Sequence, residues 1–430
     1  MTLSRRGLLT AGAAAGGALL LPACGGGAGG GGGEPLRVSW YGGTPVHEGV
    51  EGALQAWGQA HPDVPYAVEK APFDSYWDKL ATQTAGNDTP DVLRMSMSYF
   101  SEYAGRGALA DLGEAVGSTI RTDALDPDVA TSGQLADGLF GIGQSSISHA
   151  VFVHAGLLEQ VGVSVPTDWT WSTFQDFARG YAEEAGPDSW GCADLGGAFQ
   201  TFEVFARQAG TGLFAPGGTG LAVSRETVEE WYAMWERLRA DGAAPPGDVS
   251  AESTSFEESL LVRGSAPLLA GFVQQVTFYQ PLVPDADVEL VPLPSADGSP
   301  GDLSGQFLKA LDLWCVSARS RRTEDAQRLV DFLLNDPAAV QSIGLTLGVP
   351  PSASSREAVA AGADAAAQRA IDYVDRIEPA VGESPEPWPA GYGELLSTFG
   401  RLNEDIAFGR SDPGTAAQQF VDAAAAALAH

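Results

Sequence analysis

Short apolar runs alternate with amphipathic segments along the chain from Leu36 onward. Runs rich in Val, Leu and aromatic residues predict β-strands at residues 36–41, 64–69 and 90–95. Segments with apolar side chains at helical spacing lie between and after them, at residues 46–60, 73–85 and 101–107. Strands that alternate with helices in this way are typical of an α/β fold.

Boundary signals predict three more helices further along the chain. Ser224 is a favourable N-cap residue, and Gly242 is placed to end the helix that Ser224 begins. The face of this helix that we expect to be buried carries Val228, Trp231, Tyr232, Trp235 and Leu238. Another helix is predicted to begin at Thr323, with Pro337 beyond its end, and an alanine-rich helix at residues 413–429.

The first 34 residues have the pattern of an export signal followed by a tether. Arg5 and Arg6 precede an apolar stretch at residues 8–21, whose helical length of about 21 Å is too short to span a bilayer. The arginine pair resembles a twin-arginine signal, and the residues that end at Cys24 resemble a lipobox. We therefore predict a signal at residues 1–23, and a lipidated Cys24 with a glycine-rich tether at 24–34. The alternative is an ordinary cleaved signal in which Cys24 has no role.

The charge balance excludes whole classes of partner. The chain has 24 Lys and Arg against 55 Asp and Glu, a net charge of −31. Such a surface repels phosphate backbones, so nucleic-acid binding is not expected. Three cysteines are too few for a disulfide scaffold or a Cys₄ zinc site. Cys192 and Cys315 fit either a disulfide or two separate buried thiols, and the sequence does not decide between them.

No catalytic, metal or cofactor site is predicted. The five histidines are scattered, and the phosphate-loop, dinucleotide, serine-hydrolase and zinc-protease motifs do not occur. The many carboxylates leave room for a catalytic pair, but none stands out. We therefore expect a protein that is not an enzyme.

Aromatic residues stand beside predicted strand ends and loops. Trp40 and Tyr41 end the first strand, Tyr99 follows the third, and Trp388 and Tyr392 lie in a Pro/Gly-rich stretch. Ligands of open α/β sheets bind at strand-end loops, and flat aromatic faces suit the C–H faces of sugar rings. For each of these residues taken alone, packing in the core is the commoner role.

The order of segments resembles the extracellular solute-binding proteins of ABC transporters, in the group of maltose- and oligosaccharide-binding lipoproteins. The likeness covers residues 36 to about 428. It rests on short motifs in a fixed order, at residues 38–41 (Val-Ser-Trp-Tyr), 61–64 (His-Pro-Asp-Val), 76–80, 89–92, 103–109, 138–143, 151–154 and 166–174. The chain departs from the family pattern at Ile142-Gly143, at Val153-His154-Ala155, and at Phe272, where many members have Trp.

The resemblance implies a two-lobed periplasmic-binding-protein-like fold of type II, with discontinuous lobes joined by hinge strands. We expect one lobe to hold residues 35–143 plus 303–346, and the other 144–302 plus 347–430. The ligand would lie in the cleft and favour the closed form, as in the hinge closure known for periplasmic binding proteins. The expected partners are a small carbohydrate and the permease subunits of an importer, for a monomer held by its lipid on the outer face of the cytoplasmic membrane.

Ligand contacts carried over from the resemblance come from both lobes and the crossings. Gln144 and Ser145 would lie at the first crossing, and Gly305 and Gln306 at the return crossing. The remaining ligand-binding candidates are Trp40, Tyr41, Ser98, Tyr99, Phe199, Phe272, Trp388 and Tyr392. Trp169 and Trp171 are assigned to packing, with Thr170 as an N-cap.

Two alternatives remain open at this point. The same fold could bind a polyol, a glycerol phosphate, a polyamine or a peptide, although Lys70, Lys79 and Lys309 form no cluster suited to phosphate. An exported glycoside-active enzyme would need two carboxyl groups about 5–9.5 Å apart across the cleft.

Overall fold

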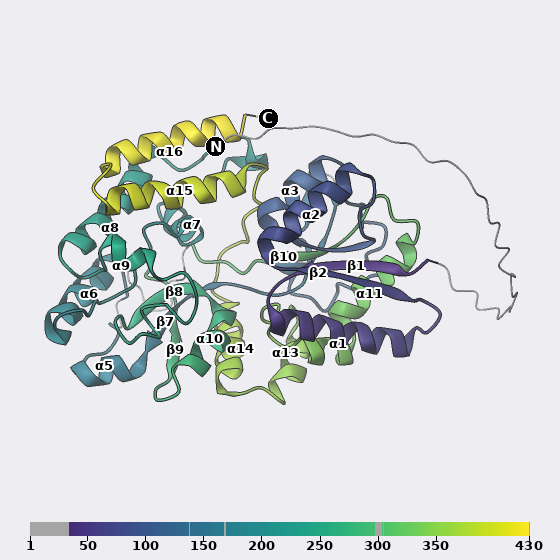
Figure 1. The fold of residues 1–430 in the computed structure, drawn as a ribbon, viewed down its shortest axis with the longest axis horizontal. Helices are drawn as coiled ribbons and strands as arrows, with labels where there is room; N and C mark the ends of the chain where they lie inside the picture. Colours follow the sequence, from purple (N-terminus) through teal and green to yellow (C-terminus); the bar gives the residue numbers. More distant parts are fainter. Residues whose placement is uncertain (1–33, 137, 167–168, 297–302, 304, 430) are drawn as a thin grey trace, which may run out of the picture.

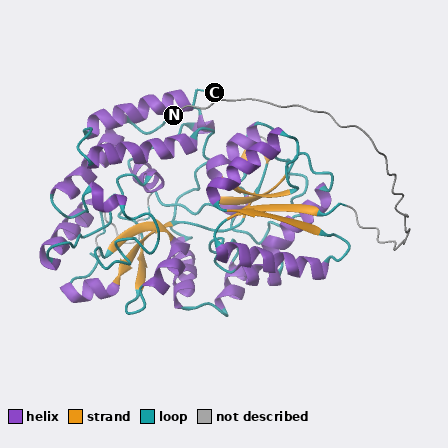
Figure 2. Cartoon of the chain, viewed as in Figure 1, coloured by secondary structure: helices purple, strands orange, loops and turns teal. Residues whose placement is uncertain are grey.

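The computed structural model describes residues 34–429 except 137, 167–168, 297–302 and 304. The chain forms two lobes side by side, each built on its own β-sheet (Figure 1 and Figure 2). The predicted signal with Arg5 and Arg6, and the predicted lipidated Cys24, lie outside the described residues. Within the described residues no helix is long and apolar enough to cross a membrane.

The elements alternate along the chain as the hydrophobic pattern predicts. The strands are β1 (Leu36–Tyr41), β2 (Tyr66–Ala71), β3 (Val92–Ser96), β4 (Gln134–Leu135), β5 (Gly138–Leu139), β6 (Ile142–Gly143), β7 (His149–His154), β8 (Leu268–Phe272), β9 (Val288–Val291) and β10 (Asp312–Val316). The helices are α1 (Thr44–Ala60), α2 (Phe73–Ala85), α3 (Met97–Gly105), α4 (Pro127–Ala130), α5 (Ala155–Val161), α6 (Trp171–Ala185), α7 (Phe199–Gln208), α8 (Arg225–Ala240), α9 (Gly247–Ala251), α10 (Val276–Tyr279), α11 (Thr323–Asn335), α12 (Pro337–Ile343), α13 (Ala353–Ala360), α14 (Ala365–Ile377), α15 (Tyr392–Ala407) and α16 (Pro413–Ala427).

Helix starts agree with the capping residues read from the sequence. The Ser224 side chain accepts a hydrogen bond from the Thr227 amide at 3.1 Å, and Thr170 caps α6 in the same way. The predicted starts of β2, β3 and α3 were wrong. β2 and β3 each begin two residues later than expected, and α3 begins at Met97 because the Ser96 side chain caps it.

The first lobe is a five-stranded sheet with helices on both faces. Its strand order is β2-β1-β3-β10-β6, with β1 parallel to β2 and β3 and with β10 antiparallel to both of its neighbours. Side chains alternate between the faces of a strand. Trp40 therefore enters the core with Trp57 and Phe332 on the face of α1 and α11, whereas Tyr41 packs with Tyr76 on the face of α2.

The second lobe combines a small sheet with an aromatic helical core. Its antiparallel strands have the order β8-β7-β9, and Phe152 and Tyr373 belong to the core between this sheet and α14. In Figure 1, α7, α8, α15 and α16 lie above the sheet, and together with α6 beside it they enclose a second core. Cys192 in this lobe and Cys315 on β10 are both free and buried, so the alternative of two separate thiols holds.

Three segments cross between the lobes, at residues 144–148, 305–311 and 344–352. They are hydrogen-bonded to one another. The Ser146 amide donates to Val349 O at 2.8 Å, and Ile147 and Lys309 exchange backbone bonds of 2.9 and 3.1 Å. The lobe limits expected from the resemblance stay a prediction.

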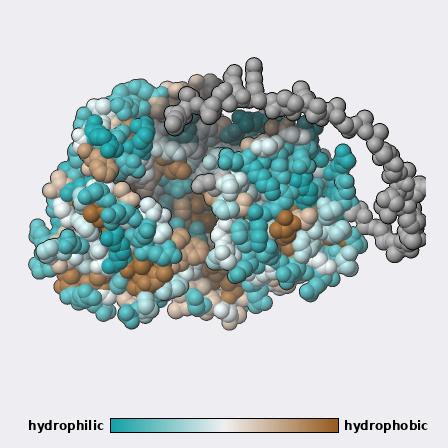
Figure 3. Space-filling model, in the orientation of Figure 1, coloured by the Kyte–Doolittle hydropathy of each residue, from teal (hydrophilic) through white to brown (hydrophobic). Residues whose placement is uncertain are grey.

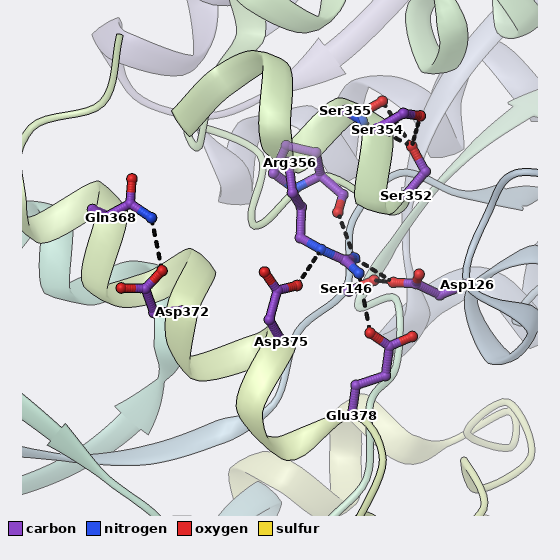
Figure 4. A network of polar contacts seen from close by, with 11 residues as sticks. Asp126, Ser146, Ser352, Ser354, Ser355, Arg356, Gln368, Asp372, Asp375 and Glu378 are labelled. Atoms are coloured by element: carbon purple, nitrogen blue, oxygen red, sulfur yellow. Dashed lines mark hydrogen bonds and ion pairs between the residues drawn. The ribbon is translucent and has the colours of Figure 1, made fainter. Parts of the chain in front are cut away.

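Arg356 of α13 lies where the crossing segments meet both lobes (Figure 4). Its guanidinium contacts the carboxylates of Asp126 at 2.8 Å, Asp375 at 2.7 Å and Glu378 at 3.0 Å. The Ser146 hydroxyl donates to the same Asp126 carboxylate. We call these five residues the Arg356 network. It ties the loop before α4 and the first crossing to the C-terminal end of α14.

Candidate functional site

The strand ends of the first lobe point toward the second lobe (Figure 1). Tyr41 ends β1, Asp312 begins β10, and Arg94 of β3 lies between them. The Arg94 guanidinium donates to Tyr41 O at 2.6 Å and to the Asp312 carboxylate at 2.9 Å, and it lies 4.3 Å from the centre of the Tyr41 ring. The Tyr41 hydroxyl donates to the other carboxylate oxygen of Asp312.

Gln144 completes this strand-end cluster. With its amide oxygen turned toward Arg94, Gln144 accepts from two guanidinium nitrogens at 3.1 Å. Burial raises the pKa of Asp312 and lowers that of Arg94, and the ion pair between them at 2.9 Å opposes both shifts because it favours the charged forms. The structure thus brings together the predicted residues Tyr41 and Gln144. Sequence reasoning missed Arg94 and Asp312, although a charged residue within the apolar run of β3 was an available signal.

Ser98 and Tyr99 lie in the first turn of α3, half-buried, where the lobes meet. The Tyr99 ring stacks on Trp77 with centroids 4.1 Å apart. A Cβ atom at Gly393 would lie 4.0 Å from Tyr99 Cε1, so the first turn of α15 approaches this ring from the second lobe.

Besides Tyr41, four predicted aromatic contacts are buried in this conformation. Trp40 is fully buried in the first lobe, and its indole donates to His47 Nδ1 at 3.1 Å. Trp388 and Tyr392 stack on each other at 4.0 Å with nearly parallel rings, and Phe199 lies 5.4 Å from Tyr392. These rings contact protein on the faces that a sugar would need.

Residues 384–391 form a strap that touches both lobes. Lys309 of the second crossing donates to Glu386 O at 2.9 Å, and its ammonium lies 4.8 Å from the centre of the Trp388 ring. The Trp388 indole donates to Glu203 of α7 at 3.0 Å, and its carbonyl accepts from Ser101 of α3. Burial lowers the pKa of Lys309 to about 8 and raises that of Glu203.

The other predicted residues lie along the crossings and the second sheet. The Phe272 ring at the end of β8 lies 4.8 Å from that of His149. Gln306 is buried and accepts from the Leu293 amide at 3.0 Å, whereas Gly305 O accepts from Arg207 at 3.1 Å. The Ser145 hydroxyl is buried without a hydrogen-bond partner among the described residues.

A cavity of about 1070 Å³ lies between the lobes, beside the strap. Its first-lobe wall consists of Ser101, Glu102, Gly105, Arg106, Asp128, Thr131, Ser132, Gln134, Leu135 and Ala136. Its second-lobe wall consists of Gly217, Gly218, Ser384, Pro385, Glu386, Pro387, Pro389, Ala390, Gly391, Glu394, Ala426, Ala427 and Leu428. None of the twelve predicted ligand contacts lines it, although Trp388 and Tyr392 adjoin lining residues. The face drawn in Figure 3 is also hollowed along the line between the lobes.

The cavity carries more negative than positive charge. Glu102, Asp128, Glu386 and Glu394 line it, and the positive lining residue Arg106 is paired with Glu102 at 2.7 Å. Hydroxyl and amide groups line it as well. Across the described residues, no group of His, Cys, Asp and Glu side chains is arranged to hold a metal ion.

Comparison with known proteins places these features in a family. The family model described as bacterial extracellular solute-binding protein matches residues 52–370. A lipoprotein of the oleD 5′ region of Streptomyces antibioticus is 25% identical over 290 residues, which are 65% of this chain and 61% of that protein. The chain thus spans less than two thirds of the length of that relative.

Solved structures share the fold over almost the whole chain. An extracellular solute-binding protein family 1 member from Alicyclobacillus acidocaldarius is 25% identical, with a TM-score of 0.72 over 93% of this chain and 100% of that one. An oligogalacturonide-binding protein from Yersinia enterocolitica, solved with saturated digalacturonic acid, is 19% identical, with a TM-score of 0.78 over 92% of this chain and 98% of that one.

Proposed function

Because this chain belongs to the bacterial extracellular solute-binding protein family, we propose that it captures a carbohydrate between its lobes for an ABC importer. The observation that carries the proposal is the cavity of about 1070 Å³ lined from both lobes. A solute that contacts both walls stabilises the arrangement in which the walls face each other. The permease subunits would then read that arrangement, and the chain itself would perform no reaction.

The groups that line the cavity between the lobes suit a neutral sugar better than an acidic one. Ser101, Thr131, Ser132 and Gln134 offer hydroxyl and amide groups to sugar hydroxyls. The excess of carboxylates in the cavity opposes uronic acids and phosphates. We extend the proposal to Ser98, Tyr99, Gln144 and Phe272 as ligand contacts at the junction.

A polyamine is the second candidate, because an acidic cavity favours a cationic ligand. A polyol would use the same hydroxyl groups as a sugar. A glycerol phosphate would need free cations, whereas Lys309 and Arg207 already donate to protein carbonyls.

Export and anchoring complete the proposal. Arg5 and Arg6 would direct twin-arginine export, and a lipid on Cys24 would hold the monomer at the outer face of the cytoplasmic membrane. Support comes from the lipobox, from the extracellular family and from the lipoprotein relative.

A thermal-shift screen of residues 34–430 tests the ligand class. The probes are maltotriose, cellotriose, digalacturonate, sorbitol, glycerol 3-phosphate and spermidine. A ligand at one hundred times its dissociation constant adds about 2.7 kcal/mol to the free energy of unfolding, which raises the melting temperature measurably. We expect a shift with a neutral oligosaccharide and unchanged sugar afterwards. A shift with spermidine alone would replace the carbohydrate by a polyamine, and cleavage of the sugar would contradict a non-catalytic role.

A further inference from the structure

Phe73 is an aromatic residue whose side chain is exposed at the surface. Its side chain is 42% exposed, and the other exposed large apolar residues of the described chain are Val68 and Phe408. Phe73 is the first residue of α2, directly after Pro72. A helix start favours small polar or acidic residues, and an exposed ring there gains little from burial. Helix formation therefore does not explain the ring.

Neighbouring rings hold Phe73 in one place. Its ring centroid lies 5.1 Å from that of Tyr41 and 5.7 Å from that of Trp77, both in edge-to-face contact. The Tyr99 centroid lies 6.3 Å away, and Tyr99 in turn stacks on Trp77. Because these buried and half-buried rings fix Phe73, a ligand that binds it would cost little side-chain entropy.

The position of Phe73 is next to the line where the lobes meet. Its neighbour Tyr99 is approached from the second lobe by Gly393. On α3, Ser101 and Glu102 follow Tyr99 and line the cavity, and Glu394 lines it from the other side of the same helix contact. The Tyr99 ring thus lies between Phe73 and the contact of α3 with α15 that borders the cavity.

The isolation of the ring fits a small ligand better than a protein. A stable protein interface buries about 800 Å² on each partner. Around Phe73 the large apolar residues are buried, and Val68 lies five residues earlier on β2. A single fixed ring is instead the size of one sugar ring, whose C–H face packs on an aromatic face.

We propose that Phe73, with Tyr99 beside it, binds one ring of a neutral oligosaccharide at the rim of the interlobe junction. This assignment rests on the proposed carbohydrate-binding function.

Calorimetric titration of matched variants tests the assignment. Maltotriose and cellotriose are titrated into wild type, Phe73→Ala, Phe73→Tyr and the control Phe408→Ala, which removes an equally exposed ring at the end of α15. We expect Phe73→Ala to weaken binding of the recognised sugar about tenfold. Phe73→Tyr should keep the affinity, and Phe408→Ala should stay within about twofold, with melting temperatures confirming that each variant is folded.

Separate outcomes overturn this assignment and the proposed function. If wild type binds a sugar and folded Phe73→Ala binds it equally well, Phe73 is not a sugar contact and the carbohydrate function stands. Unchanged affinity with impaired cellular uptake would make Phe73 a contact for the transporter, which also overturns the assignment. If wild type binds neither these sugars nor any carbohydrate of the thermal-shift screen, the proposed function fails and the assignment falls with it.

Discussion

The Arg356 network and the strap of residues 384–391 both tie the lobes together beside the crossing segments, but they do so with different chemistry. Arg356 is held by three carboxylates, one of them shared with the Ser146 hydroxyl. Trp388 is held by ring stacking, a nearby ammonium and one hydrogen bond to Glu203. Residues of the strap line the cavity, whereas no member of the Arg356 network does.

This difference predicts that mutations at the two contacts destabilise the fold for different reasons. Loss of a buried ring leaves a void, whose cost grows with its volume. Loss of a buried cation leaves carboxylates without their partner. A ligand in the cavity can contact the strap and change its conformation directly. It can change the contacts of the Arg356 network only through movement of the lobes.

The largest effect is expected for Trp388→Ala. The change removes the stack on Tyr392 and leaves the buried Glu203 carboxylate without its indole donor. We expect the free energy of unfolding to fall by about 4 kcal/mol, as measured by denaturant titration. Trp388→Phe keeps a ring and should lose less than half as much. Equal losses for the two variants would mean that the hydrogen bond, and not the ring, dominates the strap.

Arg356→Met should lower the free energy of unfolding by about 3 kcal/mol, because Asp126 would remain buried without its cation. Arg121→Met is the matched control, since Arg121 forms an exposed pair with Asp331. That control should change stability by less than about 1 kcal/mol in the same urea titration. Similar values for the two arginines would contradict a special role for the Arg356 network.

The third prediction concerns an unpaired charge at the buried start of β7. Burial lowers the pKa of His149, at the start of β7, to about 3, so the ring is neutral in the fold. The unfolded chain binds this proton near pH 6.5, so stability is present above that pH and is lost progressively as the pH falls toward 3. The loss at pH 5 should be about 2 kcal/mol. Unfolding titrations of wild type and His149→Met between pH 5 and 8 check this, and parallel curves would refute it.

The smallest effects are expected when a single hydroxyl group is removed from each of the two contacts. Ser101→Ala removes the bond to the neutral Trp388 carbonyl, and Ser146→Ala removes the bond to the charged Asp126 carboxylate. Bonds to charged acceptors are the stronger ones, so we expect losses of about 1 and about 2 kcal/mol respectively. We expect the melting temperature of Ser146→Ala to be lower than that of Ser101→Ala. The reverse order would indicate that the Asp126 carboxylate finds another donor.

The sequence was sufficient for the fold class and for part of the elements. Periodicity placed β1 and α2, and the capping residues Ser224 and Thr170 marked helix starts correctly, because both signals depend on near neighbours. The order of short motifs supplied the two-lobed architecture. The site was harder to predict from the sequence, because the residues that meet there are far apart in the chain.

Individual side chains show why the site could not be read in full. Trp40 and Tyr41 are adjacent, yet strand alternation sends the first into the core and the second to the strand-end cluster. The mutual stacking of Trp388 and Tyr392 depends on the path of the strap. Phe73 was read as part of a helix, and its exposure follows from neighbours on β1 and α3.

The place of β10 in the first sheet has a consequence for biosynthesis. This strand lies between β3 and β6, and its Asp312 pairs with Arg94, which is 218 residues earlier in the chain. Until the ribosome has released residue 316, both neighbouring strands have an unpaired edge, and such edges invite association with other chains. Closing so long a loop is also slow. We therefore expect the open edges of β3 and β6 to be prone to association until nearly three quarters of the chain has been made.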